Sequence, residues 1–316
     1  MKLLDIWNRQ GGFSLVKQYW KTGALFTALG EFLLLGPSRT SLEILRLSTQ
    51  LKVKRRLQKK YARELKAFDA SFDETLAHES SDKVWVCWLQ GMENAPQIVQ
   101  RCYRSLQENL KDRQIVLLTE ENIGQYVQFP PHIQEKWKRG VITNTHMTDL
   151  LRLELLTRYG GMWVDATVLC TSGDLPWYYS ESELFLYQSL KPGRDGHSHI
   201  TSSWLMCAKT NNKVLMAAKH LCYKYWETHE FMADYFLLHD FLAIALEFYP
   251  DEWKRIVPRD NATPHILLLR LFEPYDERMW QAIREQTPFH KLSYKFDPGA
   301  AEKPNTFYSE LLRTDG

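Results

Sequence analysis

One short segment of this 316-residue chain places charged side chains within an apolar setting. Asp149 and Arg152 lie three residues apart in a leucine-rich stretch with helical periodicity, so they share one face of a helix. Asp165 follows directly after the apolar run 162–164 and a pair of glycines. The Asp–Arg pair could be a structural ion pair, or it could bind sugar hydroxyls and a phosphate. Spacing alone leaves both interpretations open.

The elements around these residues predict that they meet at one crevice. Residues 145–159 are predicted to form a helix, and Gly160 stands where a helix C-cap favours glycine. Residues 162–164 are predicted to form a buried strand, with Asp165 at its carboxyl end. In open α/β sheets, ligands bind at that end of the strands.

Earlier elements predict an α/β fold. A strand over 83–88, a helix over 97–110 and a strand over 114–119 follow one another with short connections, which favours parallel strands. Further candidates lie later in the chain: strands over 184–187 and 204–208, and helices over 212–227 and 231–248.

The order of these features resembles a known family. Trp88 near the end of the first strand, the Asp149/Arg152 helix and the Gly160-Gly161…Asp165 strand resemble retaining GT-A glycosyltransferases of the Och1-like and capsular polysaccharide synthesis type. The resemblance covers roughly residues 83–296 and extends to later segments around Trp226, 234–240 and 287–295. It implies a Rossmann-like α/β domain over 83–316, with a mixed, mainly parallel sheet flanked by helices, after a helical N-terminal extension over 1–80.

The resemblance also implies roles for individual residues. Trp88 would line the nucleobase pocket, and Asp149 and Arg152 would hold the donor sugar. Gly161 and Asp165 would belong to the same donor site, with Asp165 binding the ribose and a divalent cation, Mn²⁺ or Mg²⁺. Such a cation neutralises the charge that a diphosphate leaving group gathers, and oxygen ligands suit it.

One departure from the family pattern concerns the metal. The second acid of the DxD motif is replaced, because the sequence reads Asp165-Ala166-Thr167. The expected ligands are therefore Asp165, the Thr167 hydroxyl and His290, since related enzymes place a C-terminal histidine on the metal. Lys291 and Lys295 would grip the diphosphate. A structural role for His290 stays open.

Two further groups are weighed for function. Asp240 would be costly to bury in an apolar helix without a purpose, so we expect it to act in catalysis by binding acceptor or sugar hydroxyls. Asp234 is better explained as a helix cap. His197 and His199 have no third ligand at zinc spacing nearby, so we interpret their loop as a lid that excludes water.

Composition sets limits on partners and on the cell compartment. The net charge is +2, so we expect no nucleic-acid partner. The five cysteines show no CxxC spacing, which argues against disulfides and a structural zinc and favours a reducing cytoplasm. Aromatic residues make up 13% of the chain, and they serve either a large core or ring-shaped ligands.

The N-terminal region raises the question of a membrane. Residues 51–66 hold eight basic residues and one acidic residue on a helical pattern, which suits either an anionic lipid surface or a helix packed on the catalytic domain. The apolar stretch 23–36 has 14 residues and contains Glu31, whereas a spanning helix needs roughly 20. We expect no signal peptide and no spanning helix.

The function expected from the resemblance is transfer of a hexose, galactose or glucose, from a UDP-sugar with retention of configuration. The acceptor would be a polyprenyl-diphosphate-linked saccharide in capsule or exopolysaccharide assembly, at the cytoplasmic face of the cell membrane. The incomplete DxD motif also allows a catalytically weak sugar-nucleotide-binding or scaffolding subunit. A nicotinamide-dependent enzyme is disfavoured because no GxGxxG follows the first strand.

Overall fold

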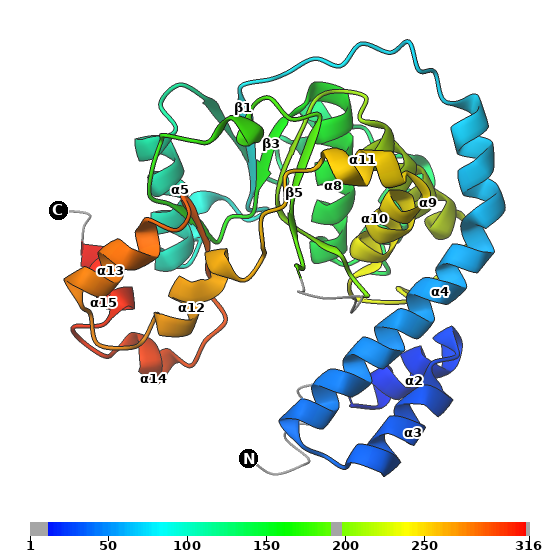
Figure 1. The fold of residues 1–316 in the computed structure, drawn as a ribbon, viewed down its shortest axis with the longest axis horizontal. Helices are drawn as coiled ribbons and strands as arrows, with labels where there is room; N and C mark the ends of the chain where they lie inside the picture. The colour runs from blue at the N-terminus through cyan, green and yellow to red at the C-terminus, as the bar shows by residue number, and fades with distance from the viewer. Residues whose placement is uncertain (1–11, 191–197, 314–316) are drawn as a thin grey trace.

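The computed structural model describes residues 12–190 and 198–313 and has a five-stranded sheet at its centre (Figure 1). The strand order is β2-β1-β3-β6-β5. β1 runs parallel to β2 and β3, whereas β6 is antiparallel to β3 and β5. The strands are β1 (Lys83–Cys87), β2 (Gln114–Leu118), β3 (Gly161–Val164), β5 (Leu184–Gln188) and β6 (Thr201–Ala208).

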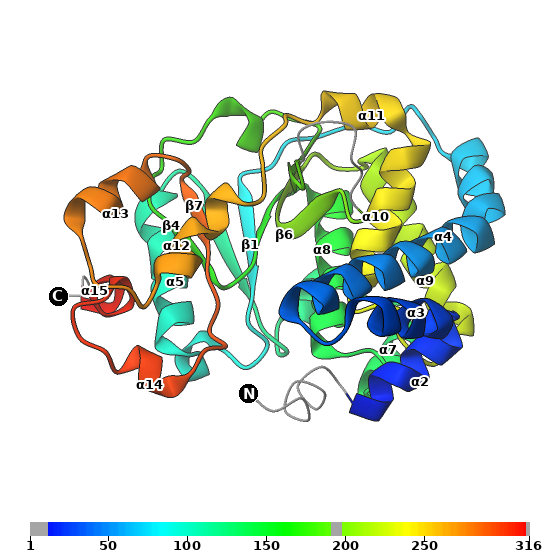
Figure 2. The same ribbon diagram turned by 60° about the horizontal axis from the view of Figure 1, so that its bottom comes forward.

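Helices cover both faces of this sheet (Figure 2). Side chains alternate along each strand, so Trp85 and Trp163 join one buried cluster while Val84 and Val164 join the other. The first cluster includes side chains of α8 (Asn144–Tyr159), α9 (Lys213–Thr228) and α10 (Leu237–Phe248). The second includes side chains of α5 (Gln97–Asn109), α12 (Ile266–Arg270) and α15 (Phe307–Arg313).

A second, two-stranded sheet brings the C-terminal part of the chain to β3. In it β4 (Val168–Cys170) pairs antiparallel with β7 (Phe289–Lys291), so that Lys291 lies opposite Val168. The remaining helices of four or more residues are short: α6 (Ile123–Tyr126), α7 (Pro131–Lys138), α11 (Pro250–Arg255), α13 (Glu277–Arg284) and α14 (Pro298–Ala301).

Three helices precede the sheet: α2 (Gly12–Thr22), α3 (Leu25–Leu35) and the long α4 (Arg39–Ser71). The second half of α4 packs on the helical layer, because Val53, Leu57, Tyr61 and Leu65 are buried in the same cluster as α9 and α10. Most basic residues between them stay exposed, whereas Lys54 is buried. The packed-helix interpretation of residues 51–66 therefore holds.

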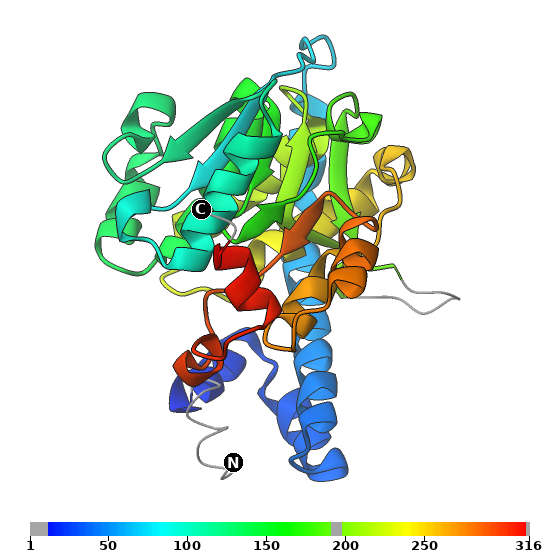
Figure 3. The same ribbon diagram turned by 90° about the vertical axis from the view of Figure 1, so that its left-hand side faces the viewer.

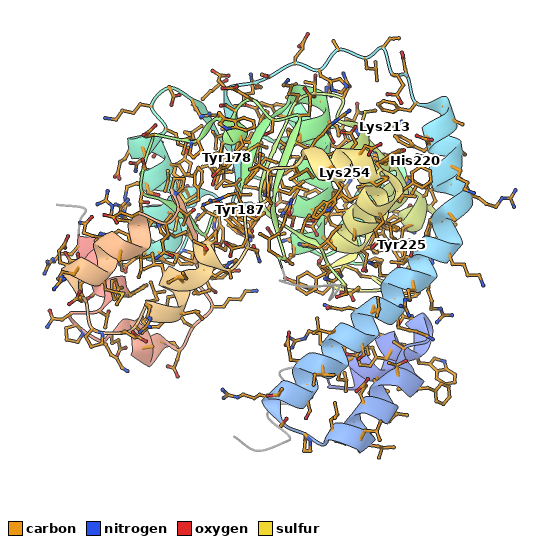
Figure 4. All side chains as sticks on the ribbon, viewed as in Figure 1. Tyr178, Tyr187, Lys213, His220, Tyr225 and Lys254 are labelled. Carbon is orange, nitrogen blue, oxygen red and sulfur yellow. The ribbon has the colours of Figure 1, made fainter. Side chains whose placement is uncertain are left out.

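Polar contacts fix α4 to α9 as well. Lys213 Nζ lies 2.8 Å from Asp69 Oδ1, and the ring of His220 lies 5.3 Å from the ring of Phe68. Lys213 and His220 are labelled on α9 in Figure 4, facing α4. The described residues contain no helix with the length and apolar character needed to cross a membrane.

The predicted α/β class, the mixed and mainly parallel sheet and the helical N-terminal region are confirmed. The five cysteines are all buried and free, as predicted. The helix predicted over 231–248 is wrong at its start, because α10 begins at Leu237. Asp234 Oδ1 accepts a hydrogen bond from the Phe236 amide at 2.7 Å, which stabilises a non-helical turn before α10.

Candidate functional site

A pocket of about 440 Å³ opens at the carboxyl ends of β1 and β3. This is the edge at which α/β sheets bind ligands. Five segments contribute its walls: the residues after β1, the first turns of α8, the residues after β3, the loop before α10, and the residues at and after β7. The lining residues used below are Trp88, Asn144, Thr145, Arg152, Asp165, Thr167, Tyr235, Lys291, Tyr294 and Lys295.

The N-terminus of α8 faces this pocket through Asn144 and Thr145. Thr143 caps the helix, since its hydroxyl accepts a hydrogen bond from the His146 amide at 3.2 Å. The free amide groups and the helix dipole give this end a positive potential that suits an anion. Residues 143–145 were not predicted as part of the site; the threonine cap before the leucine-rich stretch was the signal available in the sequence.

Arg152 is held rigidly at the back of the pocket. Its side chain is 6% exposed, and it donates to Ser203 Oγ at 2.7 Å and to the Ser203 carbonyl oxygen. The guanidinium also lies over the Trp163 ring, 4.8 Å from the ring centre. Its Nη2 lies 3.4 Å from Asp165 Oδ1, so the guanidinium is directed at the pocket and at Asp165.

Asp149 lies behind Arg152 and is absent from the described pocket lining. Its Oδ1 lies 3.2 Å from Arg152 Nη2, and its Oδ2 lies 3.2 Å from His146 Nδ1. His146 Nε2 accepts a hydrogen bond from Trp226 Nε1, so Nδ1 carries the proton that His146 donates to Asp149. The prediction that Asp149 itself binds sugar hydroxyls is therefore replaced by a role in positioning Arg152.

Asp165 and Thr167 meet a lysine from the second sheet. Lys291 Nζ lies 3.1 Å from Asp165 Oδ2 and also donates to Thr167 Oγ1. Trp163 Nε1 donates to Asp165 Oδ1 at 3.0 Å. Burial alone would raise the pKa of the Asp165 carboxyl, but the charges of Lys291 and Arg152 outweigh it and hold that pKa below its ordinary value.

These residues fit a divalent cation only in part. Asp165 and Thr167 offer a carboxylate and a hydroxyl on one wall, and the described residues contain no cluster of three or more His, Cys, Asp or Glu side chains with metal-ligand geometry. A magnesium-like ion tolerates few protein ligands when substrate phosphates and water complete its shell. Lys291 already contacts Asp165 Oδ2 and Thr167 Oγ1, so it would have to move away for such an ion to bind to both residues.

His290 points away from the pocket, and its predicted role as a metal ligand is wrong. Successive side chains of a strand point to opposite sides, so Lys291 faces the pocket and His290 is buried behind it. Its Nε2 lies 3.2 Å from the Thr171 hydroxyl, and its ring packs near Trp280. Burial lowers the pKa of His290 to about 4, so the imidazole is neutral.

An aromatic pair forms the outer wall of the pocket. The ring of Trp88 meets the ring of Tyr294 edge-on, with centres 5.3 Å apart. The Lys295 ammonium lies 5.6 Å from the centre of the Tyr294 ring. Trp88 Nε1 is buried and has no hydrogen-bond partner among the described residues. Trp88, Lys291 and Lys295 thus lie where they were predicted, beside Asp165.

Gly161 lies at the wrong end of β3 to bind a ligand in this pocket. β3 begins at Gly161, whereas the pocket lies beyond its last residue, Val164. Gly161 has φ +95°, and a Cβ there would come within 2.4 Å of the Lys83 carbonyl oxygen. The glycine is therefore needed for close packing of β3 on β1, and its prediction as a donor-binding residue is wrong.

Asp240 is fully buried in α10 and does not line the pocket. Its Oδ1 lies 3.0 Å from His199 Nε2, and burial raises its pKa well above the ordinary value. Its neighbour His239 reaches toward Arg152, because its Nε2 lies 3.2 Å from the Ser203 hydroxyl. The predicted direct catalytic role of Asp240 is not supported by this placement.

The predicted lid falls partly outside the described residues. His197 belongs to the part of the chain that is not described, whereas His199 is 8% exposed and contacts Asp240. Asp234 lies nearby, and burial together with the Asp240 carboxyl raises the Asp234 pKa to about 6.

Comparisons with known proteins agree with the resemblance read from the sequence. A model of the capsular polysaccharide synthesis protein family matches residues 38–311. The O-glycosyltransferase braB of Annulohypoxylon truncatum is 35% identical over 97 residues, which cover 28% of this chain and 23% of that protein. The match thus spans less than a quarter of that relative's length.

A solved structure, the PaToxG glycosyltransferase, aligns with 83% of this chain and 95% of its own at 11% identity, with a TM-score of 0.39. That level of similarity does not indicate which residues bind a ligand. The family model, in contrast, extends from the N-cap of α4 to α15 and includes the whole pocket. The protein therefore belongs to the capsular polysaccharide synthesis protein family.

Proposed function

We propose that this protein is a glycosyltransferase that binds a UDP-hexose in the pocket beside Asp165 and transfers the hexose, galactose or glucose. The observation that carries the proposal is the meeting of Arg152, Lys291 and Asp165 in one pocket that the N-terminus of α8 also faces. A diphosphate gathers negative charge as the glycosidic bond breaks. Fixed cations and helix amides that face it stabilise that charge.

Each wall of the pocket suits one part of the donor. The Trp88–Tyr294 pair offers aromatic surface to the uracil ring. Asp165 accepts hydrogen bonds from ribose hydroxyls, because its lowered pKa keeps it ionised at neutral pH. Lys291 and Lys295 contact the diphosphate, and Arg152 contacts the phosphate or the sugar from behind.

A divalent cation, Mn²⁺ or Mg²⁺, is part of the proposal. Asp165 and Thr167 would hold it together with the donor diphosphate and water, and it would supply further charge neutralisation to the leaving group. When no cation is bound, the Lys291 ammonium provides a positive charge at the same place. The reaction is proposed to retain configuration. The acceptor hydroxyl attacks the anomeric carbon from the same face that the leaving diphosphate occupies, since the leaving phosphate can take the acceptor proton.

The proposed acceptor is a saccharide linked to polyprenyl diphosphate, as expected for an enzyme of capsule or exopolysaccharide assembly. Such an acceptor lies in the cytoplasmic leaflet of the cell membrane. The protein would then act as a peripheral enzyme at that surface. The family description supports the polysaccharide part of this proposal.

The test is a screen of UDP- and GDP-sugars for slow nucleotide release, with Mn²⁺ and with EDTA. We expect release of UDP from one UDP-hexose, and a loss of about 10²–10³-fold in Asp165→Ala, because the carboxylate fixes the donor in the pocket. Asp251→Ala is the matched control, since Asp251 is exposed on α11 and pairs only locally with Lys254.

Two outcomes would count against catalysis. Equal UDP release by Asp165→Ala and wild type would place the reaction elsewhere. Tight UDP-sugar binding by calorimetry without any release, even with acceptor present, would instead favour the scaffolding or donor-binding subunit that the incomplete motif allows.

A further inference from the structure

The exposed apolar side chains of this protein gather at one end of the molecule. Of the fifteen large hydrophobic side chains that are exposed among the described residues, nine lie between residues 20 and 47. Six belong to α3, where they occupy most of its second half and part of its first: Phe26, Leu29, Phe32, Leu33, Leu34 and Leu35. We refer to these six as the α3 patch.

The patch is built around one row of side chains and widens at the end of α3, where Phe32, Leu34 and Leu35 are also exposed. Phe26, Leu29 and Leu33 follow the i, i+3, i+7 spacing that aligns side chains on one side of a helix, and Leu34 is adjacent. Phe26, Leu33 and Leu34 are 78%, 81% and 83% exposed. In a water-soluble protein such a contiguous patch marks a surface that another phase or molecule covers.

The patch lies apart from the central sheet and the helices that cover it. α2, α3 and the first half of α4 project from the sheet domain as a helical tip (Figures 1 and 3). The family model begins at residue 38, so α2 and α3 precede the matched region. The walls of the donor pocket therefore do not include α2 or α3.

Charge identifies the partner. Residues 12–56 contain eight Lys or Arg residues and two acidic residues, although the whole chain has a net charge of only +2. The two acids are already engaged: Glu31 accepts a hydrogen bond from Ser48 at 3.0 Å, and Glu43 pairs with Arg46 at 3.1 Å. Lys52 and Arg55 on α4 are exposed next to the helical tip. A basic surface around an apolar face suits anionic lipid, whereas two copies of it would repel each other.

The dimensions agree with a helix lying in the interface. α3 has 11 residues and is therefore about 16 Å long, which is too short to cross a bilayer. Trp20 on α2 is 66% exposed, and tryptophan favours the boundary between lipid and water.

The tip is joined to the donor pocket by a short segment. Gln18 Nε2 on α2 donates to the Ala233 carbonyl oxygen at 3.0 Å, and Lys21 Nζ lies 4.5 Å from the centre of the Phe231 ring. Tyr235, two residues beyond Ala233, lines the pocket. α4 is fixed to the same layer by Lys54 and Glu247, 2.6 Å apart. A surface bound by the tip is thus held in a defined orientation to the pocket.

We propose that the α3 patch inserts into the interfacial region of an anionic bilayer, with the basic residues of α2 and α4 on the headgroups. This moves the apolar membrane contact to α3, because the apolar side of residues 51–66 is buried against α9 and α10, while the exposed Lys52 and Arg55 keep a headgroup contact. The inference deepens the membrane partner of the proposed function, but it can be tested without any sugar nucleotide.

The test is co-sedimentation of the full chain with vesicles of phosphatidylcholine, with and without phosphatidylglycerol. We expect binding to the anionic vesicles that weakens with salt, and a loss of at least about tenfold in the double variant Phe26→Ser/Leu33→Ser. Lys52→Glu/Arg55→Glu should weaken binding to anionic vesicles alone. Leu269→Ser is the matched control, since Leu269 is 77% exposed on α12, away from the tip.

Nucleotide release separates this inference from the proposed function. The Phe26→Ser/Leu33→Ser protein should release UDP at the wild-type rate in detergent-free solution, which also shows that it folds. Wild-type binding by this folded variant would overturn the inference, as would failure of the wild type to bind anionic vesicles. A wild-type dimer in sedimentation analysis that the double variant abolishes would assign the patch to a second copy and likewise overturn it.

Discussion

Replacing Lys291 by glutamine tests whether the site works as a fixed-charge receptor for a diphosphate. Lys291 is 19% exposed and is the nearest cation to Asp165, at 3.1 Å. Its ammonium would strengthen its contacts with the diphosphate as charge develops on the leaving group. Loss of one such donor in a preorganised site costs about 2.7–4 kcal/mol, so kcat/KM should fall by about 10²–10³.

Lys295→Gln is the matched comparison, because it removes the same charge from the exposed rim of the same pocket. A solvated charge contributes about 1 kcal/mol or less, so we expect a fall of no more than about fivefold. Lys291→Arg keeps the charge and should recover part of the activity lost in the glutamine variant.

The pH profile gives a second readout. In the wild type, burial would raise the Asp165 pKa, but Lys291 and Arg152 hold it below its ordinary value, so the carboxylate stays ionised in mildly acidic buffer. Activity that needs this carboxylate is present above the Asp165 pKa and is lost as pH falls through it. Removing the Lys291 charge raises that pKa, so the acid limb of kcat/KM should move to higher pH.

The reasoning is refuted if Lys291→Gln loses no more activity than Lys295→Gln, or if its acid limb coincides with that of the wild type. Both points are decided by UDP release in a coupled assay at matched protein concentration. The assay covers pH 4 to 9 in steps of about half a pH unit.

Two further predictions concern the motif and the strand that carries it. Thr167→Asp restores a second carboxylate beside Asp165 and should lower the Mn²⁺ concentration that gives half-maximal activity, because a carboxylate oxygen is a better ligand for a hard cation than a hydroxyl. Thr167→Ser keeps the hydroxyl and should leave the metal response unchanged. An unaltered response in both variants would place the diphosphate away from Thr167. Gly161→Ala should reduce the free energy of unfolding in urea by about 3 kcal/mol, because φ is +95° and the new Cβ meets the Lys83 carbonyl oxygen at 2.4 Å. Gly30→Ala on α3, where a Cβ meets no atom within 4 Å, should not destabilise the protein. Equal stability of both variants would contradict the packing argument.

Local pattern was sufficient to predict the elements that build the pocket. β1, α5, β2, α8 and β3 each have a clear apolar period and a marked end, such as Gly160 after α8 with φ +65°. Asp165 and Trp88 could be placed correctly because each directly follows a buried strand, and the carboxyl ends of parallel strands share one edge.

Long-range pairing decided what could not be predicted. His290 was expected in the pocket because related enzymes place a C-terminal histidine on the metal, but the three-residue β7 pairs with β4 and turns alternate side chains to opposite sides. Lys291 thereby faces Asp165 and His290 does not. The reversed direction of β6 likewise depends on pairing with β3 and β5, which a short apolar run does not specify.

Buried charge misled the sequence argument in a consistent way. Asp149 was assigned to substrate by the family resemblance and Asp240 because a buried acid is costly, yet each has a partner within the fold: His146 and Arg152 for the first, His199 for the second. The ion pair of Asp149 with Arg152 was the alternative that the sequence left open. The partner of Asp240 comes from a distant segment, and only the folded structure brings it near.

The replacement of the second motif acid and the position of Lys291 explain each other. With a carboxylate at position 167, Lys291 would face two acids, and the pair would attract a divalent ion in place of the ammonium. With Thr167, one ammonium satisfies both Asp165 and the hydroxyl. The Arg152 charge is offset by Asp149, so Lys291 and Lys295 against Asp165 leave the pocket with a net charge near +1 before the donor binds. A diphosphate enters that field favourably even without a metal, which is why the activity of the wild type in EDTA, compared with that of Thr167→Asp, separates the two ways of holding it.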